Sequence, residues 1–171
     1  MATLILTVIG DEQPGLVSTL SAPVKERGGS WERSQMARLA GKFAGIVLIE
    51  VPEDRADLLV ADLVALTSQG LQVTVERTAQ PAPQDTERLQ LDLLGDDHPG
   101  IVAEISAALA SQHVSIEELV TDVRDAPMSG GTLFEAHAVL TAPAGTSTDD
   151  LGSLLEGLAH ELMVEIRLSD D

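Results

Sequence analysis

The stretch Ile9-Gly10-Asp11-Glu12-Gln13-Pro14-Gly15-Leu16-Val17 returns later in the chain as Leu94-Gly95-Asp96-Asp97-His98-Pro99-Gly100-Ile101-Val102. In each copy, an apolar β-forming run precedes a Gly-Asp turn, and a Pro-Gly pair then leads into apolar residues at helical spacing. This pattern is typical of a strand that passes into a helix through a tight loop. The repeat therefore predicts two similar units in one chain.

Both copies continue with the same order of elements. Residues 4–9 and 89–93 are the expected first strands, and each copy then shows a hairpin, a second helix and a final strand. The strands expected after the first helix are residues 31–39, 43–51 and 71–77 in one copy and 116–124, 132–141 and 163–168 in the other. The second helices are expected at residues 54–69 and 149–161, with caps at Pro52-Glu53-Asp54 and Ser147-Thr148-Asp149.

The order β-α-β-β-α-β in each half predicts an α+β fold of two ferredoxin-like units. Each unit should hold a four-stranded antiparallel sheet with two helices on one face. We expect domains at residues 1–78 and 87–171, joined by a linker at residues 79–86 that is rich in Pro and Ala and lacks periodicity. Because domains of this size bury little surface, the two copies should share an interface or the chain should form a homodimer.

Three local features give sharper expectations. Pro23 lies deep in the first helix, where it removes a hydrogen bond, so we expect a kink or an early end there. The predicted strand at residues 43–51 is apolar on both faces, since Ala44, Ile46 and Leu48 alternate with equally apolar neighbours, so something should cover its second face. The core-facing stripes of the first helices are predicted to be Leu16, Val17, Leu20 and Val24, and Ile101, Val102, Ile105 and Leu109.

The composition excludes several classes of protein. The chain has 171 residues and no cysteine, which excludes disulfides and thiolate metal sites. No apolar run approaches the roughly 18 residues of a spanning helix and no basic leader precedes the first strand, so we expect a cytoplasmic protein without a membrane segment. The net charge is −18, of which −14 falls in residues 86–171, and aromatic residues make up 2%. Such a chain should not bind nucleic acid directly.

The strand-to-helix turn is the candidate ligand site. The unpaired N–H groups at the start of a helix attract a carboxylate, and Asp11 or Asp96 could meet an ammonium group. Gly15 and Gly100 would let the backbone approach the ligand. The alternative is that the two aspartates cap their helices while the glycines serve the turn. Arg33, Arg38 and Lys42 form either a local basic patch or a solvated hairpin.

The pattern Gly-Asp-x-x-Pro-Gly-[Leu/Ile]-Val, with its helix and the β-α-β-β-α-β order, resembles the ACT domain. Two such domains in a chain of this length resemble the glycine cleavage system transcriptional repressor family. The resemblance implies that a small effector, such as an amino acid, binds at interfaces between paired domains. It also implies these ligand-binding residues: Asp11, Gln13, Pro14, Gly15, Leu16, Val17 and Ser30, with Asp96, His98, Pro99, Gly100, Ile101, Val102 and Ser115. Many amino-acid-binding relatives have asparagine where this chain has Ser30 and Ser115.

The same resemblance implies regulation of transcription through a separate protein partner in response to glycine. Sets of nucleophile and base are missing from the sequence, so we do not expect an enzyme. None of the four histidines has a recognisable metal spacing, and we expect no metal or cofactor. His98 replaces Gln13 and is either a pH-sensitive ligand residue or a solvated turn histidine. The segment Met128-Ser129-Gly130-Gly131 either touches a partner or ligand or is a plain hairpin tip.

Three functional hypotheses remain open at this point. The first is an effector-responsive regulator, with glycine or serine as possible effectors and a transcription factor as the partner. The second is a free-standing regulatory subunit of a metabolic enzyme. The third is a structural pairing module without a ligand, which the serines at positions 30 and 115 keep open.

Overall fold

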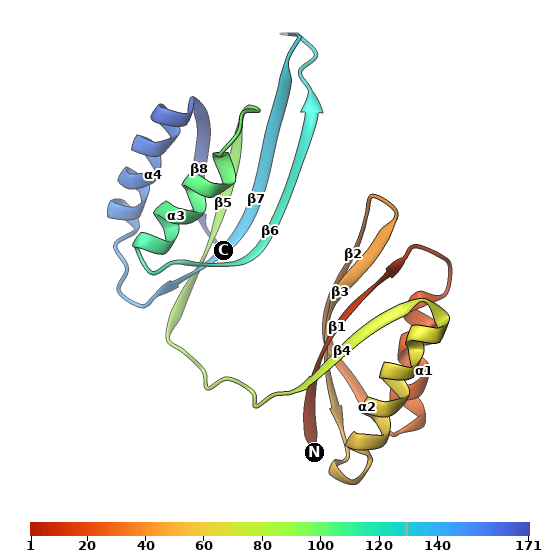
Figure 1. Ribbon diagram of the computed structural model, residues 1–171. Helices are drawn as coiled ribbons and strands as arrows, with labels where there is room; N and C mark the ends of the chain where they lie inside the picture. Colours follow the sequence, from red (N-terminus) through yellow and green to blue (C-terminus); the bar gives the residue numbers. More distant parts are fainter. Residues whose placement is uncertain (129) are drawn as a thin grey trace. The chain divides into compact units, whose positions relative to one another are not determined.

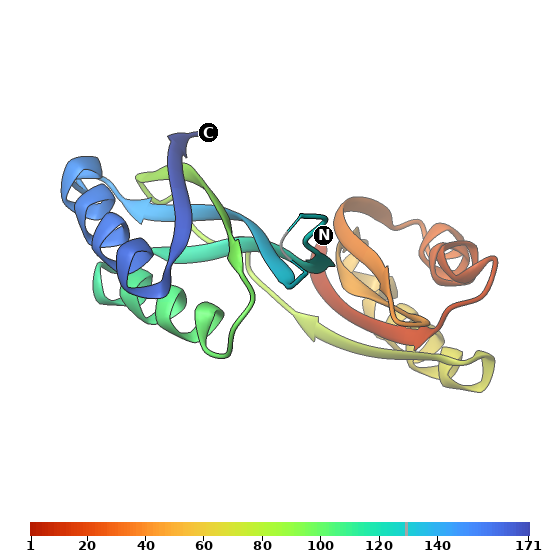
Figure 2. The ribbon, with the colours of Figure 1, turned by 90° about the horizontal axis from the view of Figure 1, so that it is seen from above.

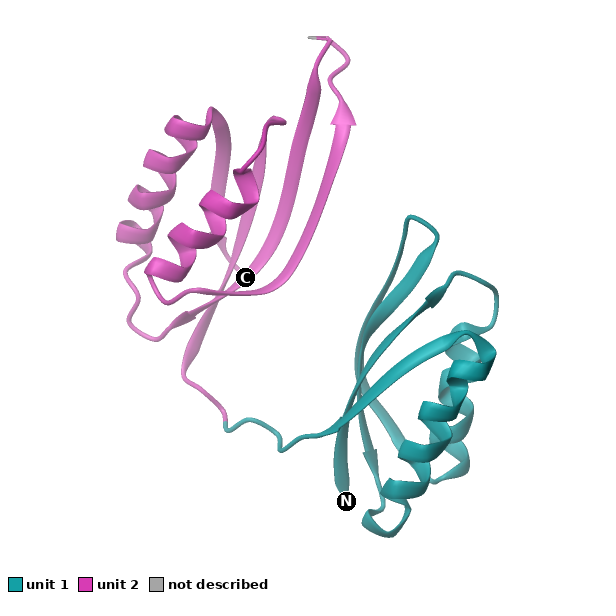
Figure 3. Cartoon of the chain, in the orientation of Figure 1, with its two compact units in different colours: residues 1–82 teal, residues 83–171 magenta. Residues whose placement is uncertain are grey.

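The computed structural model describes residues 1–128 and 130–171 (Figure 1). Contacts divide the chain into two compact units, Met1–Ala82 and Pro83–Asp171 (Figure 3). The described residues of each unit form one four-stranded antiparallel sheet with two α-helices on one face. The predicted α+β fold is confirmed. The division falls inside the segment that the sequence marks as a linker, between the strands that end at Arg77 and begin at Thr86.

Unit 1 has the sheet order β2-β3-β1-β4, so the first strand is central and the hairpin lies at one edge. Its strands are β1 (Ala2–Asp11), β2 (Ser30–Leu39), β3 (Lys42–Val51) and β4 (Leu71–Arg77). Its helices are α1 (Leu16–Glu26) and α2 (Ala56–Val64), and short 3-10 turns flank α2 as η1 (Glu53–Arg55) and η2 (Ala65–Gln69).

Unit 2 repeats this topology with the sheet order β6-β7-β5-β8. Its strands are β5 (Thr86–Asp96), β6 (Ser115–Asp125), β7 (Thr132–Pro143) and β8 (Val164–Asp170). Its helices α3 (Ile101–Ser111) and α4 (Thr148–Leu162) lie side by side on one face of the sheet (Figure 2).

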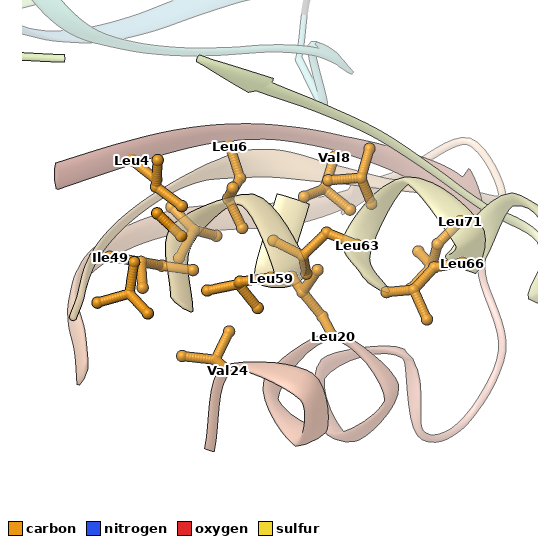
Figure 4. Packing of buried hydrophobic residues seen from close by; sticks show 14 of the residues in the cluster. Leu4, Leu6, Val8, Leu20, Val24, Ile49, Leu59, Leu63, Leu66 and Leu71 are labelled. Carbon is orange, nitrogen blue, oxygen red and sulfur yellow. The ribbon is translucent and has the colours of Figure 1, made fainter. Parts of the chain in front are cut away.

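The core of unit 1 lies between its sheet and its two helices. Alternate residues of β1, Leu4 and Leu6 among them, face the helices and are fully buried. Leu59 and Leu63 on α2 meet them from the other side (Figure 4). This period-two burial is the expected behaviour of a sheet that is covered on one face.

The predicted helix stripes need one correction. Leu16, Leu20 and Val24 are buried as expected, but Val17 is 47% exposed and its counterpart Val102 is 44% exposed. Each valine follows a buried first residue, and one step along a helix turns the side chain by about 100°. The valines therefore lie at the outer rim of the turn and not in the core.

Two other expectations fail locally, and one alternative is removed. Helix α1 continues past Pro23 to Glu26, so of the expected kink or early end the early end is wrong. The helix expected at residues 54–69 is α-helical only over Ala56–Val64, because 3-10 turns occupy both of its ends. Among the described residues no side chain caps η1. The cap at Ser147 is confirmed, since its hydroxyl accepts the Asp150 N–H at 3.2 Å.

Candidate functional site

In both units a left-handed glycine joins the first strand to the first helix. Gly15 has φ 87° and Gly100 has φ 94°, and these residues directly precede α1 and α3. Side chains with a Cβ rarely adopt this conformation, which explains the glycine in both copies. The backbone before the turn is held to the neighbouring hairpin, since Glu12 donates its N–H to the Gly41 carbonyl at 2.9 Å. The turn therefore holds the first N–H groups of the helix in a fixed position.

The two aspartates of the turns do not cap these helices. Asp11 and Asp96 are the last residues of β1 and β5, and no side chain in the described residues caps α1 or α3. Asp11 instead accepts a hydrogen bond from the Lys42 ammonium group. This bond and the charge of Lys42 lower the pKa of the Asp11 carboxyl group. Asp96 lies opposite Leu133 and so has no cation at the equivalent place.

A surface pocket of about 340 Å³ opens at the turn of unit 1. The Arg38 guanidinium donates to a carboxylate oxygen of Glu12 at 2.9 Å across this turn. The pocket thus combines a cation, an anion and the start of a helix, which are the groups that complement an α-amino acid. Its lining residues are Glu12, Gln13, Gly15, Leu16, Val17, Ser18, Arg38 and Phe43.

The sequence did not identify Arg38, Glu12, Ser18 and Phe43 as site residues. Strand pairing explains why they reach the pocket, because Arg38 lies opposite Phe43 where β2 and β3 turn back toward the end of β1. The two basic residues nearest the hairpin turn, Arg38 and Lys42, are paired with the acids of the strand-to-helix turn.

The turn of unit 2 has a different chemistry. Phe134, the counterpart of Phe43, lies opposite Val123, so a valine stands where unit 1 has Arg38. The cavity that Ile101 and Val102 help to line holds only about 20 Å³ and lies between α3 and the sheet. Its other walls are apolar side chains of β5, β6 and β7 together with Ile105, Ser106 and Leu109 of α3.

His98 fastens the turn of unit 2 to the second helix. Its Nε2 lies 2.9 Å from the Leu162 carbonyl oxygen and its Nδ1 lies 3.2 Å from the Pro99 carbonyl oxygen. These two carbonyls, Leu162 first, raise the pKa of His98 because they favour the doubly protonated ring. The histidine is therefore engaged by the backbone and is more than a solvated turn residue. Gln13 stands at this position in unit 1, beside Gly70.

The two serines lie far from the turns of their own units. Ser30 opens β2 opposite Glu50, and Glu50 pairs with Thr3 near the start of β1. Asp11 is at the other end of β1, about 25 Å away at roughly 3.3 Å per residue. Ser115 has the same placement in unit 2. A single unit therefore does not bring its serine and its Gly-Asp turn into one site.

On the sheet of unit 2, His137 lies beside two acidic residues. His137 Nδ1 is 2.5 Å from a carboxylate oxygen of Asp92, and its Nε2 is 3.4 Å from Glu135. Asp92 is the main cause of a raised pKa of His137. In the part of the chain that the structure describes, no group of three or more acidic, histidine or cysteine side chains is arranged to hold a metal ion.

Two other features of the sequence can be placed. Ala126 donates its N–H to the Gly131 carbonyl at 2.8 Å, which closes the β6–β7 connection, and Met128 is 98% exposed. Ser129 of the candidate contact loop lies outside the described residues. Within residues 1–128 and 130–171, no helix has the length and apolar character needed to span a membrane.

Comparisons with known proteins relate this chain to ACT-domain proteins. Residues 2–76 match the family model of the ACT domain. The chain is 26% identical over 163 residues to the glycine cleavage system transcriptional repressors of Escherichia coli (strain K12) and Shigella flexneri, covering 93% of this chain and 85% of each relative. A crystal structure of an unknown protein from Galdieria sulphuraria is 29% identical, with a TM-score of 0.89 over 99% of this chain and 98% of that chain.

The second unit repeats the topology of the first and the Gly-Asp-x-x-Pro-Gly turn that opens its first helix. Unit 1 therefore matches the ACT domain, and the chain as a whole is similar to the glycine cleavage system transcriptional repressors.

Proposed function

We propose that this chain is an amino-acid-responsive regulatory protein without enzymatic activity of its own. A small effector binds at the strand-to-helix turn of unit 1 and changes how the chain engages a protein partner, through which it regulates transcription. We further propose that the working form is a homodimer. Glycine and serine are the first effectors to test, because the relatives are named as repressors of the glycine cleavage system.

The observation that carries the proposal is the charge pair across the pocket of unit 1. Arg38 and Glu12 stand 2.9 Å apart at the rim of a pocket of about 340 Å³ that also contains the start of α1. An amino acid offers a carboxylate to Arg38 and the helix start, and an ammonium group to Glu12. The effector would exchange one internal ion pair for two external ones, so binding would alter the contacts of the turn.

The working site is assigned to unit 1 because unit 2 lacks these groups. Val123 replaces Arg38, and Leu133 stands opposite Asp96 where Lys42 stands opposite Asp11. His98 is already bonded to the backbone of α4. The acidic turn of unit 2 would repel a carboxylate more strongly than the turn of unit 1.

The charge of the chain supports regulation through a protein partner. A net charge of −18 repels the phosphate backbone of DNA, so a direct contact with an operator is disfavoured. For an effector to control the partner, its binding energy must differ between two arrangements of the chain. The turn of unit 1 supplies such a difference if its ion pairs exist in only one of the two arrangements.

The first test is thermal unfolding of the full chain against each of the twenty amino acids at millimolar concentration and fixed pH. A ligand at about 100 times its dissociation constant stabilises the folded state by roughly 2.7 kcal/mol. We expect a selective rise of the midpoint that disappears in Arg38→Ala. The control is Arg124→Ala, which removes an arginine from β6, the strand equivalent to β2, where it lies 3.9 Å from Glu135.

A rise that survives Arg38→Ala but is lost in His98→Ala would move the site to unit 2. A flat panel in the unmodified chain would contradict effector binding and would favour a pairing module without a ligand. Affinity purification of the tagged chain, with and without the effector, then identifies the partner. Recovery of a metabolic enzyme in place of a transcription factor would contradict the proposed route through transcription.

A further inference from the structure

The helix-free face of the sheet in unit 1 is apolar at its centre. Ile5 and Ile9 of β1 and Ile46 and Leu48 of β3 lie on this face, because their neighbours in each strand point into the core. Ile9 is 42% exposed and Ile46 is 48% exposed. We call this surface the open face of unit 1. An apolar sheet surface of this kind needs a cover.

Charged side chains lie at the two edges of the same face. Arg33 of β2 pairs with Leu48, Leu48 pairs with Ile5, and Ile5 pairs with Glu76 of β4. These four residues therefore form one row across the sheet, with a cation at one end and an anion at the other. The ion pairs among the described residues involve other side chains, so the charges of Arg33 and Glu76 remain available to a partner.

We infer that the open face of unit 1 packs face to face against the same face of a second copy of this chain, about a two-fold axis that runs parallel to the strands between β1 and β3. This axis exchanges the two edges of the sheet. Arg33 then lies opposite Glu76 of the second copy, and Leu48 lies opposite Ile5 of the second copy. The inference rests on the proposed homodimer. It does not depend on the proposed binding of an effector.

The other rows fit the same arrangement. In the next two rows, Ile46 lies opposite Thr7 of the second copy and Ala44 lies opposite Ile9. At the hairpin end, Lys42 lies opposite Asp11 of the second copy, so unlike charges meet again. A two-fold axis perpendicular to the strands would place β2 over β2 and β4 over β4 of the second copy, so Arg33 and Glu76 would not meet. The charge pattern therefore selects the parallel axis.

The open face of unit 2 is less suited to this contact, because one of its rows ends in two anions. Asp122 pairs with Glu135, Glu135 pairs with Leu94, and Leu94 pairs with Glu165. The same two-fold operation would place Asp122 opposite Glu165 of the second copy, which brings two anions together. This row of unit 2 therefore repels itself, whereas the charged row of unit 1 is self-complementary.

The area is sufficient for a specific contact. The sheet has four strands spaced about 4.8 Å apart, and the matched part of each strand covers about eight residues at roughly 3.3 Å per residue. The face therefore has an area of roughly 500 Å² per copy. Both copies together bury about 1,000 Å², which meets the lower bound for a specific interface. Face-to-face packing of sheets with nearly aligned strands is a common arrangement, and the two sheets lie about 10 Å apart.

The test is the molar mass of the full chain by sedimentation equilibrium over a micromolar concentration series. We expect a dimer, and we expect Arg33→Glu and Glu76→Arg each to raise the dissociation constant at least about tenfold, since the two-fold axis applies each change twice. The double reversal restores the unlike pairs, so its dissociation constant should return to within about threefold of the unmodified value. Leu48→Lys should give a monomer.

The controls are the equivalent changes on the sheet of unit 2, Glu118→Arg for Arg33→Glu and Val139→Lys for Leu48→Lys, and both should leave the dimer intact. An unmodified chain that is monomeric overturns both the homodimer and this surface. A dimer that tolerates Leu48→Lys overturns the surface alone. Single reversals that weaken the dimer without rescue by the double reversal overturn the two-fold arrangement. Circular dichroism checks that each variant is folded.

Discussion

The ring nitrogen Nε2 of His98 lies 2.9 Å from the carbonyl oxygen of Leu162, the last residue of α4. The other ring nitrogen faces the Pro99 carbonyl at 3.2 Å. A neutral imidazole can donate only one hydrogen bond, whereas the protonated ring can donate to both carbonyls. The link between the turn of unit 2 and its second helix is therefore strongest when His98 is charged.

This link predicts a pH-dependent contribution to the stability of unit 2. The folded pKa of His98 is raised above its ordinary value of about 6.5, so its contribution is fully present below that pH and is lost as pH rises through the folded pKa. We expect His98→Gln to destabilise unit 2 at pH 5.5 and to have little effect at pH 8.5. Urea unfolding followed by circular dichroism at both pH values measures the difference. A larger effect at pH 8.5 would contradict the prediction.

A second titration concerns the sheet of unit 2. Asp92 contacts His137 Nδ1 at 2.5 Å and is the main reason that the pKa of His137 is raised. We expect Asp92→Asn to lower the pKa of His137 toward its ordinary value, as followed by the ring proton shifts in an NMR titration. Asp149→Asn, on α4 at the other face of the sheet, is the control and should leave that pKa unchanged. An unchanged pKa in Asp92→Asn would show that the contact does not form in solution.

Two adjacent leucines of α2 should differ strongly in their effect on stability. Leu59 is fully buried against the sheet, whereas Leu58 is 51% exposed. Leu59→Ala should destabilise unit 1 by about 2–5 kcal/mol, because it removes core contacts and leaves a cavity. Leu58→Ala should change stability by less than about 1 kcal/mol. Trp31, the single tryptophan of the chain, packs on this core and reports unfolding of unit 1 by fluorescence during urea titration.

Two glycines should respond to alanine in opposite directions. A Cβ at Gly45 would lie 2.3 Å from the Gln35 carbonyl oxygen, so Gly45→Ala should cost about 1–3 kcal/mol through overpacking between β2 and β3. Gly152 lies within α4, where a Cβ would meet nothing within 4 Å. Gly152→Ala should stabilise unit 2 by about 0.5–1 kcal/mol through higher helix propensity. Trp31 fluorescence and circular dichroism, respectively, measure the two changes, and equal signs would contradict the prediction.

The fold was accessible from the sequence because its strongest signals are local and occur twice. Alternation in β1 and helical spacing after Pro-Gly reflect burial on one face of each element, and the structure buries those faces. Because the sequence repeats, the order of elements read in one copy also predicts the topology of the other copy. The predicted burial of Val17 and Val102 was wrong. Each valine directly follows a buried first helical residue, and spacing alone does not fix which way a helix is rotated about its axis.

The candidate site was less accessible, because strand register decides which side chains meet. Asp11 and Lys42 are brought together by the pairing of β1 with β3, and Arg38 meets Glu12 through the same hairpin. No local sequence pattern predicts these contacts. The carbonyl of Leu162 was equally hidden, since any residue at that position offers the same backbone oxygen to His98.

The segment between the end of β4 at Arg77 and the start of β5 at Thr86 limits how far the two units of one chain can separate. In an extended, proline-rich form it would span about 25 Å, at roughly 3.1 Å per residue. If two chains associate through unit 1, each particle carries two tethered copies of unit 2. A partner with two matching sites would then gain avidity, because the second encounter takes place at a high effective concentration set by the tether length.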